Sequence, residues 1–301
     1  MNPQFLVDGV LTGAMIGLGA IGLTIAYSIL RFGNFAHGEL ISWGAYLSLL
    51  LAAGIGALTG GGPPIGDLTF GLPLIVATPL AMAATAALAL TLDVVLFRRL
   101  RRHGAEIVMV IASFGASIAL RSTLEFLFTS QPRYVGTDIA IAIPMGFGLR
   151  ATQDQMLLLC VAALLMLGMH LLMTRTRLGR SMRAVSENPA LARLTGIDVT
   201  AVVRATWLIG GALAGAAGVF LGITVQIRPT MGFDLLLPLF SAAILGGIGS
   251  VPGAMLGGLI IGIAEALAVP LIGAEYRAAV AFLILLAMLL GRPSGLFGTQ
   301  A

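Results

Sequence analysis

The chain has 301 residues, of which 58% are hydrophobic and only 10% are charged, with a net charge of +4. With a mean hydropathy of +1.02, this composition excludes an ordinary water-soluble domain, because the polar side chains are too few to cover the apolar surface. All 17 basic residues are arginines, so a P-loop nucleotide site, which needs a lysine, is excluded, and their position at the ends of apolar runs indicates membrane topology rather than nucleic-acid binding.

Apolar runs of membrane-spanning length follow one another along the chain. A helix needs about twenty residues to cross a hydrocarbon layer of roughly 30 Å. We predict an all-α, polytopic integral membrane protein that forms one transmembrane domain over residues 1–301, with eight or nine transmembrane or half-membrane helices. The expected spans are 7–30, 39–57, 72–97, 105–128, 153–174, 199–225, 235–247, 253–272 and 276–290. The run 235–247 is too short to cross alone and is predicted to be a half-helix or part of a broken span.

Two arginine clusters orient these spans. The first contains Arg98, Arg99, Arg101 and Arg102, and the second contains Arg175, Arg177, Arg180, Arg183 and Arg193. Two spans separate the clusters, so both face the same side, which the positive-inside rule assigns to the cytoplasm. The side of the N-terminus stays open, because it depends on whether the run 235–247 crosses the membrane.

The first polar interruption is RFGNFAHGEL, residues 31–40. If a helix restarts after Gly33, Asn34 is a natural cap, and Glu39 in the first turn is favoured by the helix dipole. His37 and Glu39 are two residues apart and do not share a helical face. These polar residues either satisfy the backbone of a broken helix or line a path for a polar solute.

A second break has the same design. In GGIGSVPG, residues 246–253, Ser250 is placed to cap a new helix and Pro252 to occupy its first turn. Backbone left unpaired at membrane depth is tolerated only where it faces protein or a watery cavity. Gly247, Gly249 and Ser250 are therefore candidates for lining a pathway, and the alternative is that the glycines only allow close helix packing.

Ionisable residues inside the spans are further candidates for function. Arg121 and Glu125 are four apart and share a helical face, so we predict a structural ion pair near the outer surface. Glu265 has no partner near it in the sequence, which favours a place in a cavity or between subunits. No metal site is predicted, because the single cysteine and the scattered histidines do not stand at ligand spacing. The histidines are His37, His103 and His170.

The polar stretch of about residues 175–198 contains a short helix. Asn188 is its predicted cap, Pro189 its first residue and Gly196 its terminator. Leu191 and Leu194 share one face of this helix. An apolar face on the cytoplasmic side predicts docking into a partner's groove, or alternatively contact with lipid headgroups.

Three stretches together resemble the Liv-type branched-chain amino-acid permeases. They are GLTIAYSILRFGNFAHGELISWGAY (22–46), GRSMRAVSENPALARLTGID (179–198) and AAILGGIGSVPGAMLGGLIIGIAEAL (242–267). They lie in the same order as in the family and extend from the first span almost to the end of the chain. The motif NFAHGE resembles the LivH-like rather than the LivM-like member. The resemblance implies a multi-pass permease subunit of the bacterial inner membrane that is not an enzyme and holds no cofactor.

The resemblance also implies partners. These are a LivM-like second permease subunit, two cytoplasmic ATP-binding-cassette ATPases that bind the ATP, a periplasmic solute-binding protein and the lipid bilayer, but no nucleic acid. Glu187 to Gly196 would be the segment that couples to an ATPase. The expected pathway residues are Asn34, His37, Glu39, Gly247, Gly249, Ser250 and Glu265.

The expected cargo is a branched-chain or other hydrophobic amino acid, moved inward by alternating access. Related permeases with similar motifs move urea, amides or aromatic acids, so these cargoes stay as alternatives. An ion-coupled secondary transporter is disfavoured because paired carboxylates or lysines are scarce inside the spans. A passive channel for urea-like solutes has no need of the capped cytoplasmic helix.

Overall fold

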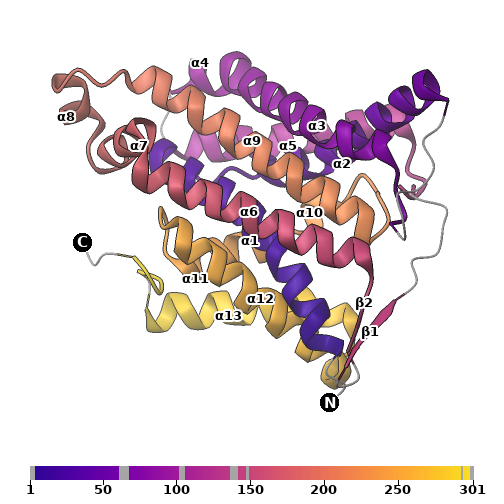
Figure 1. Ribbon diagram of the computed structural model, residues 1–301. Helices are drawn as coiled ribbons and strands as arrows, with labels where there is room; N and C mark the ends of the chain where they lie inside the picture. The colour runs from indigo at the N-terminus through magenta and orange to yellow at the C-terminus, as the bar shows by residue number, and fades with distance from the viewer. Residues whose placement is uncertain are drawn as a thin grey trace.

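The computed structural model describes residues 4–60, 68–101, 106–135, 142–146, 149–292 and 294–298. Over these ranges the chain forms a bundle of helices with one small antiparallel hairpin, β1 (Ile143–Gly146) paired with β2 (Leu149–Ala151) (Figure 1). The helices are α1 (Gln4–Leu30), α2 (Ala36–Thr59), α3 (Leu72–Leu92), the π-helical turn η1 (Asp93–Phe97), α4 (Arg98–Leu100), α5 (Glu106–Phe128), α6 (Gln153–Arg175), α7 (Arg177–Glu187), α8 (Pro189–Leu194), α9 (Val199–Thr224), α10 (Met231–Asp234), α11 (Leu236–Gly246), α12 (Val251–Ile272), the 3₁₀ turn η2 (Ala274–Tyr276) and α13 (Arg277–Gly291).

Eight helices within the described ranges are long and apolar enough to cross a membrane. They correspond to eight of the nine predicted spans, with α3, η1 and α4 forming one of them. The ninth, 235–247, is α11, whose 11 residues are fewer than the roughly twenty that a crossing needs. The predicted all-α, polytopic fold is confirmed, and α11 is too short to cross the membrane alone, as predicted.

Contacts at the two ends of helix α1 define the two ends of the bundle. At the hairpin end, defined by β1 and β2, the Gln4 amide nitrogen donates to the Arg150 carbonyl oxygen over 2.9 Å. At the arginine-rich end, the Arg31 side chain donates to the Ser186 carbonyl oxygen in α7. Helix α1 therefore runs from the hairpin end to the arginine-rich end, and Figure 1 shows the chain then passing back and forth between them.

The described arginines of both clusters lie at the arginine-rich end. Phe97 directly precedes the first cluster in the chain. Its ring centroid lies 5.2 Å from that of Phe32, the residue after Arg31. The second cluster belongs to the end of α6 and to α7 and α8. This arrangement fits the positive-inside prediction for one shared side. Arg102 and His103 lie outside the described residues.

Helix α1 lies at the centre of the bundle and packs closely on α12 through glycines. A Cβ atom added to Gly258 would lie 2.4 Å from the Cα atom of Gly17, and one added to Gly262 would lie 2.3 Å from the backbone nitrogen of Gly13. Small residues spaced four apart allow such backbone contact between membrane helices. These glycines hold α12, and with it Glu265, against α1.

Replacing Gly258 with Val is expected to lower the melting temperature of the detergent-solubilised protein, because α1 and α12 must separate. Overpacking of this kind costs about 1–3 kcal/mol. Gly168→Val is the matched control, since no atom lies within 4 Å of its added Cβ. Equal melting temperatures for the two variants, measured by size-exclusion chromatography after heating, would contradict this packing.

Two connections turn back into the bundle, one from each end. After α1 ends at Leu30, residues 31–35 return alongside it, and His37 at the start of α2 contacts the Gly19 carbonyl oxygen at 3.0 Å, three turns before the end of α1. After α9, Ile227 forms a β-bridge with Arg133, and the chain enters α10, where the Gly232 N–H donates to Ser42 Oγ of α2 over 2.9 Å. The starts of α2 and α10 therefore meet inside the bundle.

Candidate translocation site

The side chains of Asn34 and His37 satisfy backbone groups around the start of α2. Asn34 Oδ1 accepts from the Ala36 N–H at 3.1 Å, although the helix cap is Phe35 and not Asn34 as predicted. His37 Nε2 lies 3.0 Å from the carbonyl oxygen of Gly19. Both residues are buried, and these contacts match the alternative in which the polar residues support a broken helix.

Glu39 lies on a different face of α2 from His37, as predicted, and forms the centre of a buried ionic cluster. Its Oε1 is 2.7 Å from Arg121 Nη2 and accepts a 3.1 Å hydrogen bond from Ser117 Oγ. The Arg121 guanidinium also stacks 4.2 Å from the ring centroid of Phe233 in α10. Glu39 is completely buried, so this cluster joins the first turns of α2 to α5 and to α10.

The predicted ion pair between Arg121 and Glu125 is wrong. Among the described residues Arg121 pairs with Glu39, and no ion pair includes Glu125. Glu125 is only partly buried and keeps access to water or headgroups, whereas Glu39 has no exposed surface. A fully buried carboxylate needs a compensating charge more than a partly exposed one does.

Sequence reasoning missed the contribution of Phe233 and Ser117 to this cluster and the inward return of the segment before α10. The signal was present in QIRPTMGFD, residues 226–234, where polar residues, Pro229 and Gly232 follow the span 199–225. Gly232 has no room for a side chain, because an added Cβ would lie 1.9 Å from the Gly38 carbonyl oxygen. This close approach brings α10 against α2.

The second break lies at the arginine-rich end and starts α12 as predicted. Ser250 is the N-cap of α12, and its side chain accepts from the Gly253 N–H. Gly247 and Gly249 have φ angles of +97° and +87°, which favour glycine. The Gly249 N–H donates to Thr24 Oγ1 of α1 over 2.8 Å. This break therefore lies beside the last turns of α1, apart from Glu39 and Glu265.

Glu265 lines a cavity of about 820 Å³ at the hairpin end. Residues of α1, α6, α9, α10, α11, α12 and α13 contribute to the wall, and so do the turn η2 and the segment that follows α9. Glu265 is 5% exposed. The predicted pathway residues thus fall into three places, namely the start of α2, the break before α12 and this cavity.

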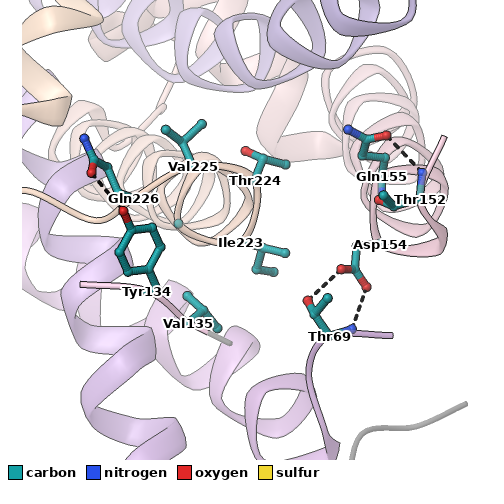
Figure 2. A pocket seen from close by; sticks show the side chains of 11 residues that line it. Thr69, Tyr134, Val135, Thr152, Asp154, Gln155, Ile223, Thr224, Val225 and Gln226 are labelled. Carbon is teal, nitrogen blue, oxygen red and sulfur yellow. Dashed lines mark hydrogen bonds between the residues drawn. The ribbon is translucent and has the colours of Figure 1, made fainter. Parts of the chain in front are cut away.

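A second cavity, of about 460 Å³, also lies at the hairpin end (Figure 2). Its wall includes Thr69, Tyr134 and Asp154, and it shares Gln155 and residues 224–226 with the larger cavity. Asp154 accepts hydrogen bonds from the backbone N–H and the Oγ1 hydroxyl of Thr69 at 3.0 and 2.6 Å, which Figure 2 draws as dashed lines. Asp154 therefore connects the chain before α3 to the start of α6. It is not among the residues that line the larger cavity.

The short helix of the polar loop forms as predicted. Asn188 caps α8 by accepting from the N–H groups of Ala190 and Leu191, both at 3.0 Å, and Gly196 beyond its end has a φ angle of +85°. Leu191 and Leu194 are 59% and 85% exposed. In Figure 1, α8 lies at the periphery of the arginine-rich end.

Helix α7 anchors this segment to the bundle. Its Met182 and Val185 side chains are buried in the core, and the Ser186 carbonyl accepts from Arg31. Glu187 is the last residue of α7, and Pro189 the first of α8. The α7–α8 segment is thus a fixed projection with an exposed apolar face.

Comparison with known proteins identifies the family. Residues 5–289 match the family model described as the permease component of branched-chain amino acid transport systems. The chain is 35% identical to the high-affinity branched-chain amino acid transport permease BraD of Pseudomonas aeruginosa, over 98% of this chain and 95% of BraD. It is also 35% identical to LivH of Escherichia coli K12, over 99% and 98% of the two chains, and 26% identical to the probable LivH of Methanocaldococcus jannaschii, over 100% and 94%. The chain therefore belongs to the family of permease components of branched-chain amino acid transport systems.

Proposed function

We propose that this chain is the membrane-spanning subunit of an ATP-driven importer for branched-chain or similar hydrophobic amino acids in the bacterial inner membrane. The observation that carries the proposal is the match to branched-chain amino acid permeases over nearly the whole chain. The subunit itself catalyses no covalent reaction. It provides the route, and a separate motor provides the energy.

The motor is a pair of cytoplasmic ATP-binding-cassette ATPases. The chain has no lysine and hence no P-loop of its own. The projecting segment from Glu187 to Gly196 provides the docking surface, because Leu191 and Leu194 present apolar area at the arginine-rich end. Burial of a helix's apolar face in a groove is a common mode of protein docking.

The route uses the broken segments for alternating access. The cavity with Glu265 receives the solute at the hairpin end, where a periplasmic binding protein delivers it. The inward-turning starts of α2 and α10, joined through Glu39, Arg121 and Phe233, close the route below the cavity. ATP binding by the motor moves the α7–α8 segment and shifts the equilibrium towards an inward-open state, in which the break at Gly247, Gly249 and Ser250 borders the exit.

The importer contains a second, LivM-like permease subunit alongside this chain.

Affinity purification of this chain from its native membranes, followed by an ATPase assay of the purified material, tests whether the chain works with an ATPase. Copurified ATPase activity is expected. Isolation of this chain with no ATPase activity, under conditions that keep it folded, contradicts the proposal and favours a secondary transporter or channel.

The cargo is a separate question, because the resemblance of the motifs leaves urea, amides and aromatic acids as alternatives. Isothermal calorimetry of the cognate binding protein with leucine, urea and an aromatic acid distinguishes these cargoes. We expect heat from leucine binding. A binding protein that ignores leucine and binds urea would replace the cargo but leave the ATP-driven machine intact.

A further inference from the structure

The cavity at the hairpin end contains a buried carboxylate that forms no hydrogen bond with the described residues. Glu265 lies on α12, close to the end of this helix at Ile272, and is only 5% exposed. Its Oε1 atom accepts no hydrogen bond from any described residue. A carboxylate in a membrane span is costly unless it is paired or serves a ligand. Glu265 therefore has a free acceptor at the wall of a cavity that is large enough for a solute.

Two arginines line this cavity, and only one of them forms an ion pair with a described residue. Arg228 and Asp234 pair with each other at 3.2 Å and are about half exposed, so they largely neutralise one another. Arg277, at the start of α13, lines the same cavity and interacts electrostatically with Glu265. It takes part in none of the ion pairs that join described residues. The remaining charged residues of the wall are Asp8 and Glu275.

Apolar side chains complete the wall next to these charges. Leu11 and Met15 come from α1, and Leu235 and Pro238 come from the α10–α11 region. One cavity thus offers an anion, a cation and an apolar surface. These are the three features needed to receive a free α-amino acid with an aliphatic side chain.

We propose that Glu265 binds the α-ammonium group and Arg277 the α-carboxylate of an amino acid as it enters this subunit. The aliphatic side chain then lies against Leu11 and Met15. The site favours zwitterionic solutes over neutral ones such as urea, which offer no full charge to either residue. This inference rests on the proposed function and adds the chemical basis on which the permease itself accepts its cargo.

The first test measures ATP-driven leucine uptake by the complete transporter in proteoliposomes. We expect Glu265→Gln to lower the rate at subsaturating leucine by about tenfold or more, the loss that follows when a charge-assisted hydrogen bond is removed. Glu265→Asp, which keeps the charge, is expected to retain part of the rate. Glu125→Gln is the matched control, because Glu125 lies on α5 and lines neither cavity at the hairpin end. Equal rates for the wild type and Glu265→Gln would overturn the proposal.

The second test detects solute in the cavity by its effect on thiol labelling and does not depend on transport. Thr12 also lines the cavity, so Thr12→Cys in a Cys160→Ser background provides a single thiol for a methanethiosulfonate reagent. Leucine is expected to slow labelling of this thiol, whereas 4-methylpentanoate, which lacks the ammonium group, is not. Adding Glu265→Gln is expected to abolish the protection by leucine, and protection that persists would overturn the proposal.

These outcomes separate this inference from the proposed function. If the wild-type complex takes up leucine and Glu265→Gln does so equally well, only the Glu265 site is wrong. If the wild-type complex takes up urea and not leucine, both the cargo and the site are wrong. If Glu265→Gln loses the second permease subunit on purification while Glu125→Gln keeps it, Glu265 has an inter-subunit role and the solute site is wrong.

Discussion

Replacing both Leu191 and Leu194 with Asp is expected to reduce ATP-driven uptake to the level measured without ATP. Both side chains are largely exposed in this chain, so their replacement removes little packing from the bundle. In a complex with an ATPase the same change would place two charges in an apolar groove, which is strongly unfavourable without compensating partners. Uptake into proteoliposomes, together with the amount of ATPase retained on purification, measures the effect.

Thr200→Asp is a suitable control for this experiment. Thr200 is exposed in the first turn of α9, so it adds a negative charge near the same loop where the helix dipole favours it. We expect this variant to transport like the wild type. Uptake by the Leu191→Asp/Leu194→Asp variant within about twofold of the control, less than 0.5 kcal/mol by the usual conversion, would show that α8 does not couple transport to the ATPase.

Arg121→Met is expected to destabilise the protein strongly. It leaves the completely buried Glu39 carboxylate without its counter-charge, and breaking one side of a buried pair costs about 3–5 kcal/mol. The double variant Glu39→Gln/Arg121→Met is expected to lose less than the sum of the two single variants, because the second change removes the uncompensated charge. Melting temperatures in detergent or denaturation midpoints in SDS provide the measurement.

Glu125→Gln tests whether Arg121 pairs with Glu39, as observed, or with Glu125, as the spacing of four residues predicts. Glu125 forms no ion pair with a described residue, so we expect its replacement to change stability by no more than about 0.5 kcal/mol. If Glu125→Gln were as destabilising as Arg121→Met, the assignment of Arg121 to Glu39 would be wrong.

The parts of the fold that follow from local chemistry were predictable from the sequence. Membrane-spanning runs can be recognised because about twenty consecutive apolar residues have few other stable environments. The caps of α8 and α12 were predictable because Asn188 and Ser250 stand directly before a proline or a Val-Pro pair that suits a first helical turn. These features depend on neighbours within a few residues.

The parts that depend on distant neighbours were not predictable. Arg121 lies one turn from Glu125 but pairs with Glu39, 82 residues away, because the return of residues 31–35 sets the depth of α2 beside α5. The same holds for the cavity around Glu265, whose wall is built from seven helices, the turn η2 and the segment after α9. Glu265 itself could be selected as an unpaired intramembrane charge, but Arg277 could not be identified as its neighbour without the packing of α13.

The most direct test of the account compares the purified chain alone with the chain assembled with its second permease subunit and ATPases, both in proteoliposomes. We predict that leucine accumulates against its gradient only in the assembled vesicles, only with ATP and the binding protein present, and not in response to a proton or sodium gradient. Uphill accumulation by the chain alone, driven by an ion gradient and without any ATPase, would contradict it.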